Sequence, residues 1–198
     1  MTARKIVVGV TGASGAPYAR RLLGVLRERA RSKGDVEVAC VLSPTARSVW
    51  ELECGGTPED LGVAIHRPDD YRAPFASGSA GWHAMAIVPC SMGAAGRIAH
   101  GTSDSLLTRA ADVMLKERRT LIVVPRESPM STIHLENLLT LAHAGALVLP
   151  ASPSFYSQPR TLDDAVDTVV GRVLDHLGVE HALLRRWGTP ADGSKENR

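Results

Sequence analysis

The chain has 198 residues, of which 44% are hydrophobic and 22% charged, a size and composition that suit one domain with a sizeable core. Its 23 basic residues nearly balance its 21 acidic ones and do not form blocks, which argues against binding to nucleic acid or to an anionic membrane. The sequence shows no secretory signal, no apolar run long enough to span a bilayer and no metal-ligand spacing among Cys40, Cys54 and Cys90, so we expect a cytoplasmic protein without a metal.

Apolar runs predict five buried strands, over 5–10, 36–43, 84–91, 120–127 and 145–152. Helical spacing of apolar residues predicts helices over 13–32, 44–54, 93–100, 103–118, 131–144 and 161–178. This alternation indicates an α/β fold with a parallel sheet and helices on both faces, a Rossmann-like or flavodoxin-like three-layer sandwich. We expect a single domain over 1–187 and a polar tail over 188–198, with 55–82 as a long connection poor in strands.

The turn between the first strand and the first helix lies in GVTGASGAPYARRLL, residues 9–23. Its glycines let a ligand approach the backbone, Ser14 adds a hydroxyl donor, and the N-terminus of the following helix favours an anionic group. The spacing of Gly9, Gly12 and Gly15 fits neither the dinucleotide fingerprint nor a P-loop. The loop therefore either binds an anionic ligand or is only a tight connection.

All five predicted strands end in segments rich in Gly, Ser or Pro. Because parallel α/β sheets bind ligands at the carboxyl ends of their strands, these segments should form one rim. The candidate contacts for a phosphorylated planar ligand at this rim are Gly12, Ser14, Ser43, Ser91 and Arg126. An N-cap role is an equally good interpretation of Ser43, Ser91 and Ser131, because each precedes a predicted helix.

Charged residues lie beside two of the predicted elements. Arg126 and Glu127 follow the apolar run TLIVVP, where a strand leaves the core, so they either face a cleft or form a structural ion pair. Arg109 and Lys116 lie two turns apart on one face of the helix expected over 103–118, for which a solvated surface is the alternative.

Tyr156 and Arg172 lie in a loop and in the helix that follows it. A phenol and a guanidinium near the same rim could grip a second phosphate, since Arg binds phosphate through two parallel hydrogen bonds. Two anion sites would indicate two substrates.

As a whole, residues 4–187 resemble the flavin prenyltransferases of the UbiX type, in a wider family of homo-oligomeric, flavin-binding, decarboxylase-like proteins. The resemblance rests on TGASGAPYARRLL, ASGS at 76–79, VPCSMG, LLTRAADVMLKERRTLIVVPRESPMSTIHLENL, FYSQPRTLDD and LLRRWG. It implies an enzyme that transfers a dimethylallyl group from dimethylallyl phosphate to N5 and C6 of reduced FMN, without a metal. The product, prenylated FMN, would serve a separate decarboxylase of the UbiD type. The resemblance also implies trimers assembled into a homododecamer, with sites at subunit borders.

The same resemblance assigns roles to individual residues. The FMN contacts that it implies are Gly12, Ala13, Ser14, Ser43, Ser91, Met92, Gly93, Ala94 and Arg126. It implies that the prenyl phosphate is held by Lys116, Glu127, Tyr156 and Arg172. Arg109 is counted among the cofactor contacts and would also help to hold the prenyl phosphate. Glu53 would lie close to the reacting groups, and Trp187 would supply an aromatic face. Glu53, Glu127 or the departing phosphate would accept the proton released from the flavin.

Two other functions stay open. The first keeps FMN but decarboxylates a cysteine, as other members of the wider family do. Those relatives carry a catalytic His soon after the first helix, whereas the corresponding segment here, SPTARSVWELE, has none. The second is a flavin-carrying subunit of a decarboxylase complex, in which the four phosphate-holding residues would have no reason to coexist. The sequence also leaves open whether the prenyl donor is a monophosphate or a diphosphate.

Overall fold

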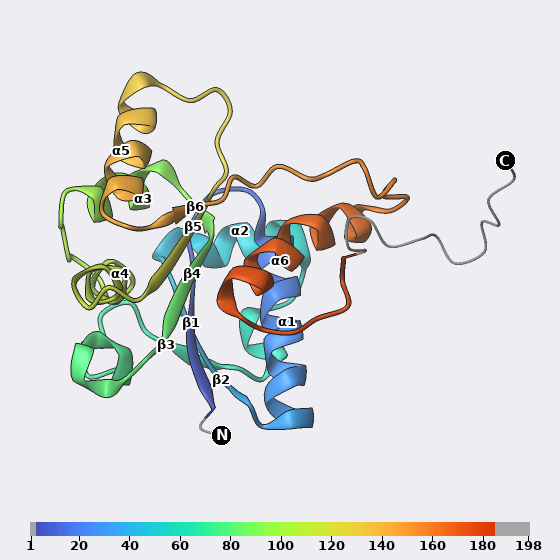
Figure 1. Cartoon of the computed structure of the whole chain (residues 1–198), viewed down its shortest axis with the longest axis horizontal. Helices are drawn as coiled ribbons and strands as arrows, with labels where there is room; N and C mark the ends of the chain where they lie inside the picture. Colours follow the sequence, from blue (N-terminus) through green and yellow to red (C-terminus); the bar gives the residue numbers. More distant parts are fainter. Residues whose placement is uncertain (1–2, 185–198) are drawn as a thin grey trace, which may run out of the picture.

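Short runs rich in Val, Ile and Ala form a six-stranded sheet in the computed structural model, which describes residues 3–184 (Figure 1). The strands are β1 (Arg4–Val10), β2 (Val36–Leu42), β3 (Ala64–His66), β4 (Ala84–Cys90), β5 (Thr120–Pro125) and β6 (Leu147–Val148). They lie in the order β3-β2-β1-β4-β5-β6, and every neighbouring pair is parallel. The predicted α/β fold is confirmed.

Within residues 3–184, six α-helices cover the two faces of the sheet. On one face lie α1 (Ala16–Lys33), α2 (Pro44–Cys54) and α6 (Leu162–Leu177), and on the other lie α3 (Met92–Ala99), α4 (Leu106–Lys116) and α5 (Thr132–His143) (Figure 1). Short 3₁₀ turns at Pro58–Leu61, Pro74–Ala76 and Gly78–Ala80 connect the β2 side of the sheet with β4. None of the helices in this range is long and apolar enough to cross a membrane.

Alternation along the strands divides the core into two halves. Ile6 and Val8 of β1 pack with the α1 and α6 side, whereas Val7 between them packs with the α4 side. Each is fully buried, and burying one such aliphatic side chain stabilises the fold by roughly 1.5–3 kcal/mol. The sheet is therefore a continuous apolar wall between the two helical layers.

Helix α1 begins three residues later than the pattern predicts, at Ala16. Gly15 has a φ of 120°, outside the helical region, and Pro17 favours the first helical turn because its φ is already fixed near the helical value. The predicted apolar stripe is confirmed, since all its members are buried: Ala16, Ala19, Leu22, Leu23 and Leu26. Residues 11–15 are thus left as a loop at the end of β1.

The edges of the sheet differ from the sequence expectation. The connection 55–82 contains β3, which pairs with β2 but is too short to give a strand pattern in the sequence. At the other edge, β6 is only two residues long, although Leu149 and Ala151 still donate backbone hydrogen bonds to the β5 side at 2.9 and 3.0 Å. β5 ends at Pro125, so the residues that follow it lie in a loop.

Candidate functional site

A crevice is expected where β1 and β4 lie side by side. The chain continues from β1 to β2 on one side and from β4 to β5 on the other, and parallel α/β sheets bind ligands at such a switch point. The loop 11–15 follows β1, and Ser91 follows β4. The loop after β1 and the loop after β4 therefore lie side by side at the same end of the sheet.

Thr11, which the sequence reasoning missed, joins these two loops. Its Oγ1 donates to the carbonyl oxygen of Pro89 and accepts from the backbone N–H of Ser91, both at 2.7 Å. Its side chain is buried, so both hydrogen bonds are protected from water. A polar residue directly after an apolar strand was the signal available in the sequence.

Gly12 is needed because α2 approaches the loop closely. A Cβ at Gly12 would collide with the Oγ1 of Thr45, in the first turn of α2. Ser43 precedes that turn, and its backbone N–H donates to the carbonyl of Val10 at 2.9 Å. Ser43 is the N-cap residue of α2, as predicted, but its hydroxyl lies 3.3 Å from Thr45 Oγ1 and makes no cap hydrogen bond to the helix.

The first turn of α3 carries the candidate FMN contacts that follow β4. Here the N-cap interpretation is confirmed, because Ser91 Oγ accepts from the backbone N–H of Ala94 at 3.3 Å. Within the described residues, no hydrogen bond occupies the backbone N–H groups of Met92 and Gly93, the first two of the helix. These two donors are available to an acceptor on a ligand.

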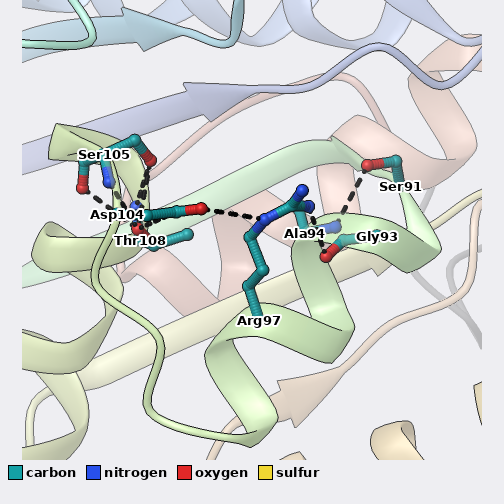
Figure 2. A network of polar contacts seen from close by, with 7 residues as sticks. All are labelled: Ser91, Gly93, Ala94, Arg97, Asp104, Ser105 and Thr108. Carbon is teal, nitrogen blue, oxygen red and sulfur yellow. Dashed lines mark hydrogen bonds and ion pairs between the residues drawn. The ribbon is translucent and has the colours of Figure 1, made fainter.

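Figure 2 shows how this turn is held in place. Arg97 lies between α3 and the loop before α4: its Nη1 donates to the Gly93 carbonyl at 3.0 Å, and its Nε donates to Asp104 at 3.1 Å. Asp104 also accepts from the hydroxyl of Thr108 at 3.3 Å, and Thr108 contacts the α4 N-cap, Ser105. The turn is thereby tied to the start of α4.

The carboxylate of Glu53, at the end of α2, lies on the N-terminus of α1. One of its oxygens accepts from the backbone N–H groups of Gly15 and Ala16, both at 2.8 Å. Burial by itself raises the pKa of Glu53, but hydrogen bonds from Ser14, Gly15 and Ala16 and the charge of Arg126 outweigh it and leave this pKa below its usual value. The anion that we expected a ligand to supply at this helix end is thus a side chain, which corrects the prediction for α1.

Arg126 and Glu127 follow β5 and are exposed at the same end of the sheet. The backbone N–H of Arg126 donates to the Cys90 carbonyl at 3.3 Å, which places it beside the β4 loop. Its charge also acts on Tyr18, whose pKa is raised by burial and lowered in part by Arg126. Within the described residues, Arg126 and Glu127 form no ion pair with each other, and their place in a cleft stays a prediction.

Lys116 and Arg109 lie on α4, away from that end. Lys116 is the last residue of α4, four residues before β5 starts, and its Nζ pairs with Glu117 at 2.6 Å. Arg109 pairs with Asp112 at 3.1 Å and donates to the Ala76 carbonyl at 3.1 Å. Because β5 rises about 3.3 Å per residue, Lys116 and Glu127 are separated by a strand about 20 Å long.

Tyr156 and Arg172 lie on the α6 side of the sheet. The backbone N–H of Ser154 donates to the hydroxyl of Thr168 at 3.0 Å, so the loop carrying Tyr156 runs along α6 one turn before Arg172. Tyr156 is exposed, and residues 153–156 line an open pocket of about 440 Å³. Tyr156 lies two residues after Ser154 and Arg172 lies one turn after Thr168, so both are on the α6 side of the sheet.

Within one chain, the candidate residues form separate groups. The largest group lies at the end of the sheet where β1, β2, β4 and β5 finish: Gly12, Ala13, Ser14, Ser43, Glu53, Ser91, Met92, Gly93, Ala94, Arg126 and Glu127. Lys116 and Arg109 belong to the layer of α3, α4 and α5, and Arg172 to the layer of α1, α2 and α6. Trp187 lies outside the described residues. Among those residues, no three His, Cys, Asp or Glu side chains gather as metal ligands.

FMN fits the crevice on the structure's own evidence. Gly12 lets the loop after β1 pack directly against Thr45 of α2, and Ala13, Gly93 and Ala94 add at most a methyl group to the ends of β1 and β4. The two available N–H groups at the start of α3 suit the acceptors of a phosphate or of a flavin ring, and Arg126 adds a positive charge. The residues present are thus compatible with a planar, anionic ligand of this kind.

Comparison with known proteins gives consistent results. The sequence profile of the Flavoprotein family matches residues 1–174. Flavin prenyltransferase UbiX from Methanocaldococcus jannaschii is 45% identical over 93% of this chain and 99% of its own. The structure of AnUbiX (PadA1) in complex with FMN and dimethylallyl pyrophosphate has a TM-score of 0.89 at 38% identity, covering 96% of this chain and 100% of its own. The structure of a dodecameric FMN-dependent UbiX-like decarboxylase from Escherichia coli O157:H7 has a TM-score of 0.88 at 45% identity. The match covers 93% of this chain and 100% of that chain.

Proposed function

The chain belongs to the Flavoprotein family, as a flavin prenyltransferase of the UbiX type, and we propose on this premise how its residues share the reaction. The enzyme transfers a dimethylallyl group from a dimethylallyl phosphate to N5 and C6 of reduced FMN. The observation that carries the assignment is that Gly12, Ser91 and Arg126 follow three neighbouring strands, β1, β4 and β5, at the same end of the sheet.

FMN is held at this crevice by backbone groups more than by charged side chains. The loop Gly12–Ser14 and the first turn of α3 offer close approach and N–H donors, Ser43 adds a hydroxyl from the β2 side, and Arg126 adds the positive charge. When bound, reduced FMN supplies the nucleophilic ring atoms to which the dimethylallyl group becomes attached. Thr11 keeps the two loops at a fixed separation through its pair of buried hydrogen bonds.

The prenyl phosphate is held by Lys116, Tyr156 and Arg172, with help from Arg109, two turns before Lys116 on α4. The sheet separates Lys116 from Arg172 within one chain, so one pocket that uses both must take them from different subunits. A dodecameric relative is consistent with this arrangement, since a closed assembly repeats the same border at every subunit. We infer that each active site lies at a border between subunits of a homo-oligomer, a dodecamer.

These side chains act on the charge that develops as the allylic C–O bond breaks. The leaving group carries negative charge, which Lys116, Arg109 and Arg172 stabilise by electrostatic preorganisation, while the hydroxyl of Tyr156 steadies the phosphate. Trp187 provides an aromatic face for the positively charged allylic carbon. No metal is needed where three cationic side chains surround the phosphate.

A proton must leave the ring after the new bonds form. Glu127 is exposed beside the crevice, and its Oε1 accepts only the backbone N–H of Ser128 within the described residues, at 3.1 Å. Glu53 is committed to the α1 terminus, and its lowered pKa makes it a weaker base than an ordinary glutamate. We therefore assign the proton transfer to Glu127, with the departing phosphate as the other acceptor.

An anaerobic incubation tests the function directly. Purified protein is mixed with reduced FMN and dimethylallyl phosphate, and the bound flavin is weighed by mass spectrometry, with the diphosphate tried in parallel. A gain of one C5 unit establishes the transfer. Unmodified FMN would reject it and would turn attention to carbon dioxide release from a cysteine-ended peptide, or to a stoichiometric complex with a decarboxylase.

The product is a cofactor, so another protein must bind and use it. We propose a UbiD-type decarboxylase as its recipient, in the same compartment. Cys40, Cys54 and Cys90 are all free thiols, in keeping with a reducing cytoplasm.

A further inference from the structure

Asp175 lies between Arg172 and a buried histidine. One of its carboxylate oxygens pairs with Nη1 of Arg172 at 3.0 Å, and the other lies 3.2 Å from Nε2 of His181. The side chain of His181 is only 1% exposed and that of Asp175 only 16%, whereas that of Arg172 is 55% exposed. The three residues thus form a chain of contacts from the interior to the surface.

The contacts of His181 indicate its tautomer. The backbone N–H of Leu183 donates to His181 Nδ1 at 3.1 Å, so Nδ1 carries no proton and accepts. The remaining nitrogen, Nε2, therefore carries the proton and donates it to Asp175. Both ring nitrogens are used, which fixes the orientation of the imidazole and, through it, the plane of the Asp175 carboxylate.

Gly171, next to Arg172, allows the histidine to come this close. A Cβ at Gly171 would collide with the side chain of Leu184 and lie 3.0 Å from Cε1 of His181. The segment after α6 folds back over this glycine, so the histidine is built into the packing of the helix beside Arg172. An ordinary exposed pair of Arg172 and Asp175 at i,i+3 would need no such support.

We propose that His181 and Asp175 are positioning residues that hold the Arg172 guanidinium ready for the prenyl phosphate. Asp175 accepts a hydrogen bond from one nitrogen of the guanidinium. The remaining N–H groups can then donate to the phosphate as a pair. His181 keeps Asp175 from rotating away. The proposal rests on the proposed function, in which Arg172 binds the prenyl phosphate.

The test compares KM, kcat and FMN affinity among variants of the full-length enzyme. Asp175→Asn keeps an acceptor for His181 but removes the charge facing Arg172, and His181→Leu removes the donor while filling the volume. We expect each to raise KM for dimethylallyl phosphate about tenfold, with FMN affinity and the mass of the assembly unchanged. His181→Gln, whose amide places an N–H donor near the position of Nε2, should restore KM to within about twofold of wild type.

A matched control is present on the same helix. Asp167 is 18% exposed and pairs with Arg21 at 2.6 Å, outside the site, so Asp167→Asn should leave KM unchanged. If Asp175→Asn alters KM no more than Asp167→Asn does, or weakens FMN binding to the same degree as prenyl phosphate binding, the positioning role is rejected. Should His181→Leu fail to fold, Asp175→Asn decides alone.

Arg172→Ala separates failure of the inference from failure of its premise. If this variant leaves KM for dimethylallyl phosphate unchanged, the assignment of Arg172 in the proposed function is wrong. If it raises KM while Asp175→Asn and His181→Leu do not, Arg172 binds the phosphate without help, and only the inference is overturned.

Discussion

The carboxylate of Glu53 lies 2.8 Å from the amide nitrogen of Gly15, across the N-terminus of α1. A negative group at this point satisfies helix donors that would otherwise lack a partner and interacts favourably with the helix dipole. Hydrogen bonds therefore fix both ends of the loop before α1. Glu53 accepts from Gly15 and Ala16 at its end, and Thr11 accepts from Ser91 at its beginning.

Glu53→Gln should lower stability by about 1 kcal/mol at neutral pH, because the amide lacks the charge that favours the helix terminus. The folded-state pKa of Glu53 lies below the ordinary value of 4.5, so its charge stabilises the fold above that pH. The difference from wild type should shrink as pH falls from about 4.5 through the folded-state pKa. Thermal unfolding at matched protein concentration, repeated at several pH values, measures the difference in stability between the variant and wild type. Glu51→Gln, at an exposed position of the same helix, is the control, and an equal effect in both variants would contradict the assignment.

Gly12→Ala should weaken FMN binding about tenfold or more, because the new methyl group collides with Thr45 and displaces the loop or α2. Fluorescence titration of FMN gives the dissociation constant. Gly24→Ala is the matched control: a Cβ there meets nothing within 4 Å, and alanine favours the helix. Equal FMN affinity in the two variants would show that Gly12 does not shape the flavin site.

Glu127→Gln should keep FMN affinity and slow the formation of prenylated flavin about tenfold or more, since the amide cannot accept the proton. Single-turnover mixing with reduced FMN and dimethylallyl phosphate gives the rate. Glu136→Gln, at an exposed position on α5, should react at the wild-type rate. An unchanged rate in Glu127→Gln would leave the departing phosphate as the base.

Lys116→Ala and Glu127→Gln should each be slowed about tenfold or more as pure oligomers and recover activity when co-assembled. The two side chains lie at opposite ends of β5, so a site that uses both draws them from two chains. Random assembly of equal amounts places both intact residues in about one site out of four, so about a quarter of the wild-type rate is expected. Mixing the variants after denaturation, or co-expressing them, provides the sample. Absence of any recovery would place both residues of a site in one subunit.

Much of the fold follows from local pattern. The run KIVVGV, the glycine loop and the stripe of α1 predicted β1, a turn and a helix, because burial on both faces and helical spacing leave clear traces in the sequence. β3 left no such trace, because three residues at a sheet edge are too few to show alternation. The end of β5 at Pro125 shows the usual uncertainty of boundaries, which depend on pairing with a neighbour.

The site was less accessible to this reasoning. Gly12 and Ser91 could be placed at the rim because strand ends converge in any parallel sheet. The partner of the α1 terminus could not, because Glu53 reaches it from 37 residues away along the chain. Lys116 and Glu127 stand close together in the sequence, but β5 lies between them and places them at opposite ends of a strand.

On the proposed roles of Lys116 and Arg172, the sheet that separates them would make turnover depend on the assembly of subunits. If each site lies at a border between subunits, as proposed, a single subunit holds only part of each prenyl phosphate pocket. At concentrations where subunits separate, the rate should rise more steeply than in proportion to the amount of protein, as it does for any reaction whose catalyst must first associate. The cell would then obtain the modified flavin only from assembled oligomers, and dissociated subunits would not consume the prenyl donor.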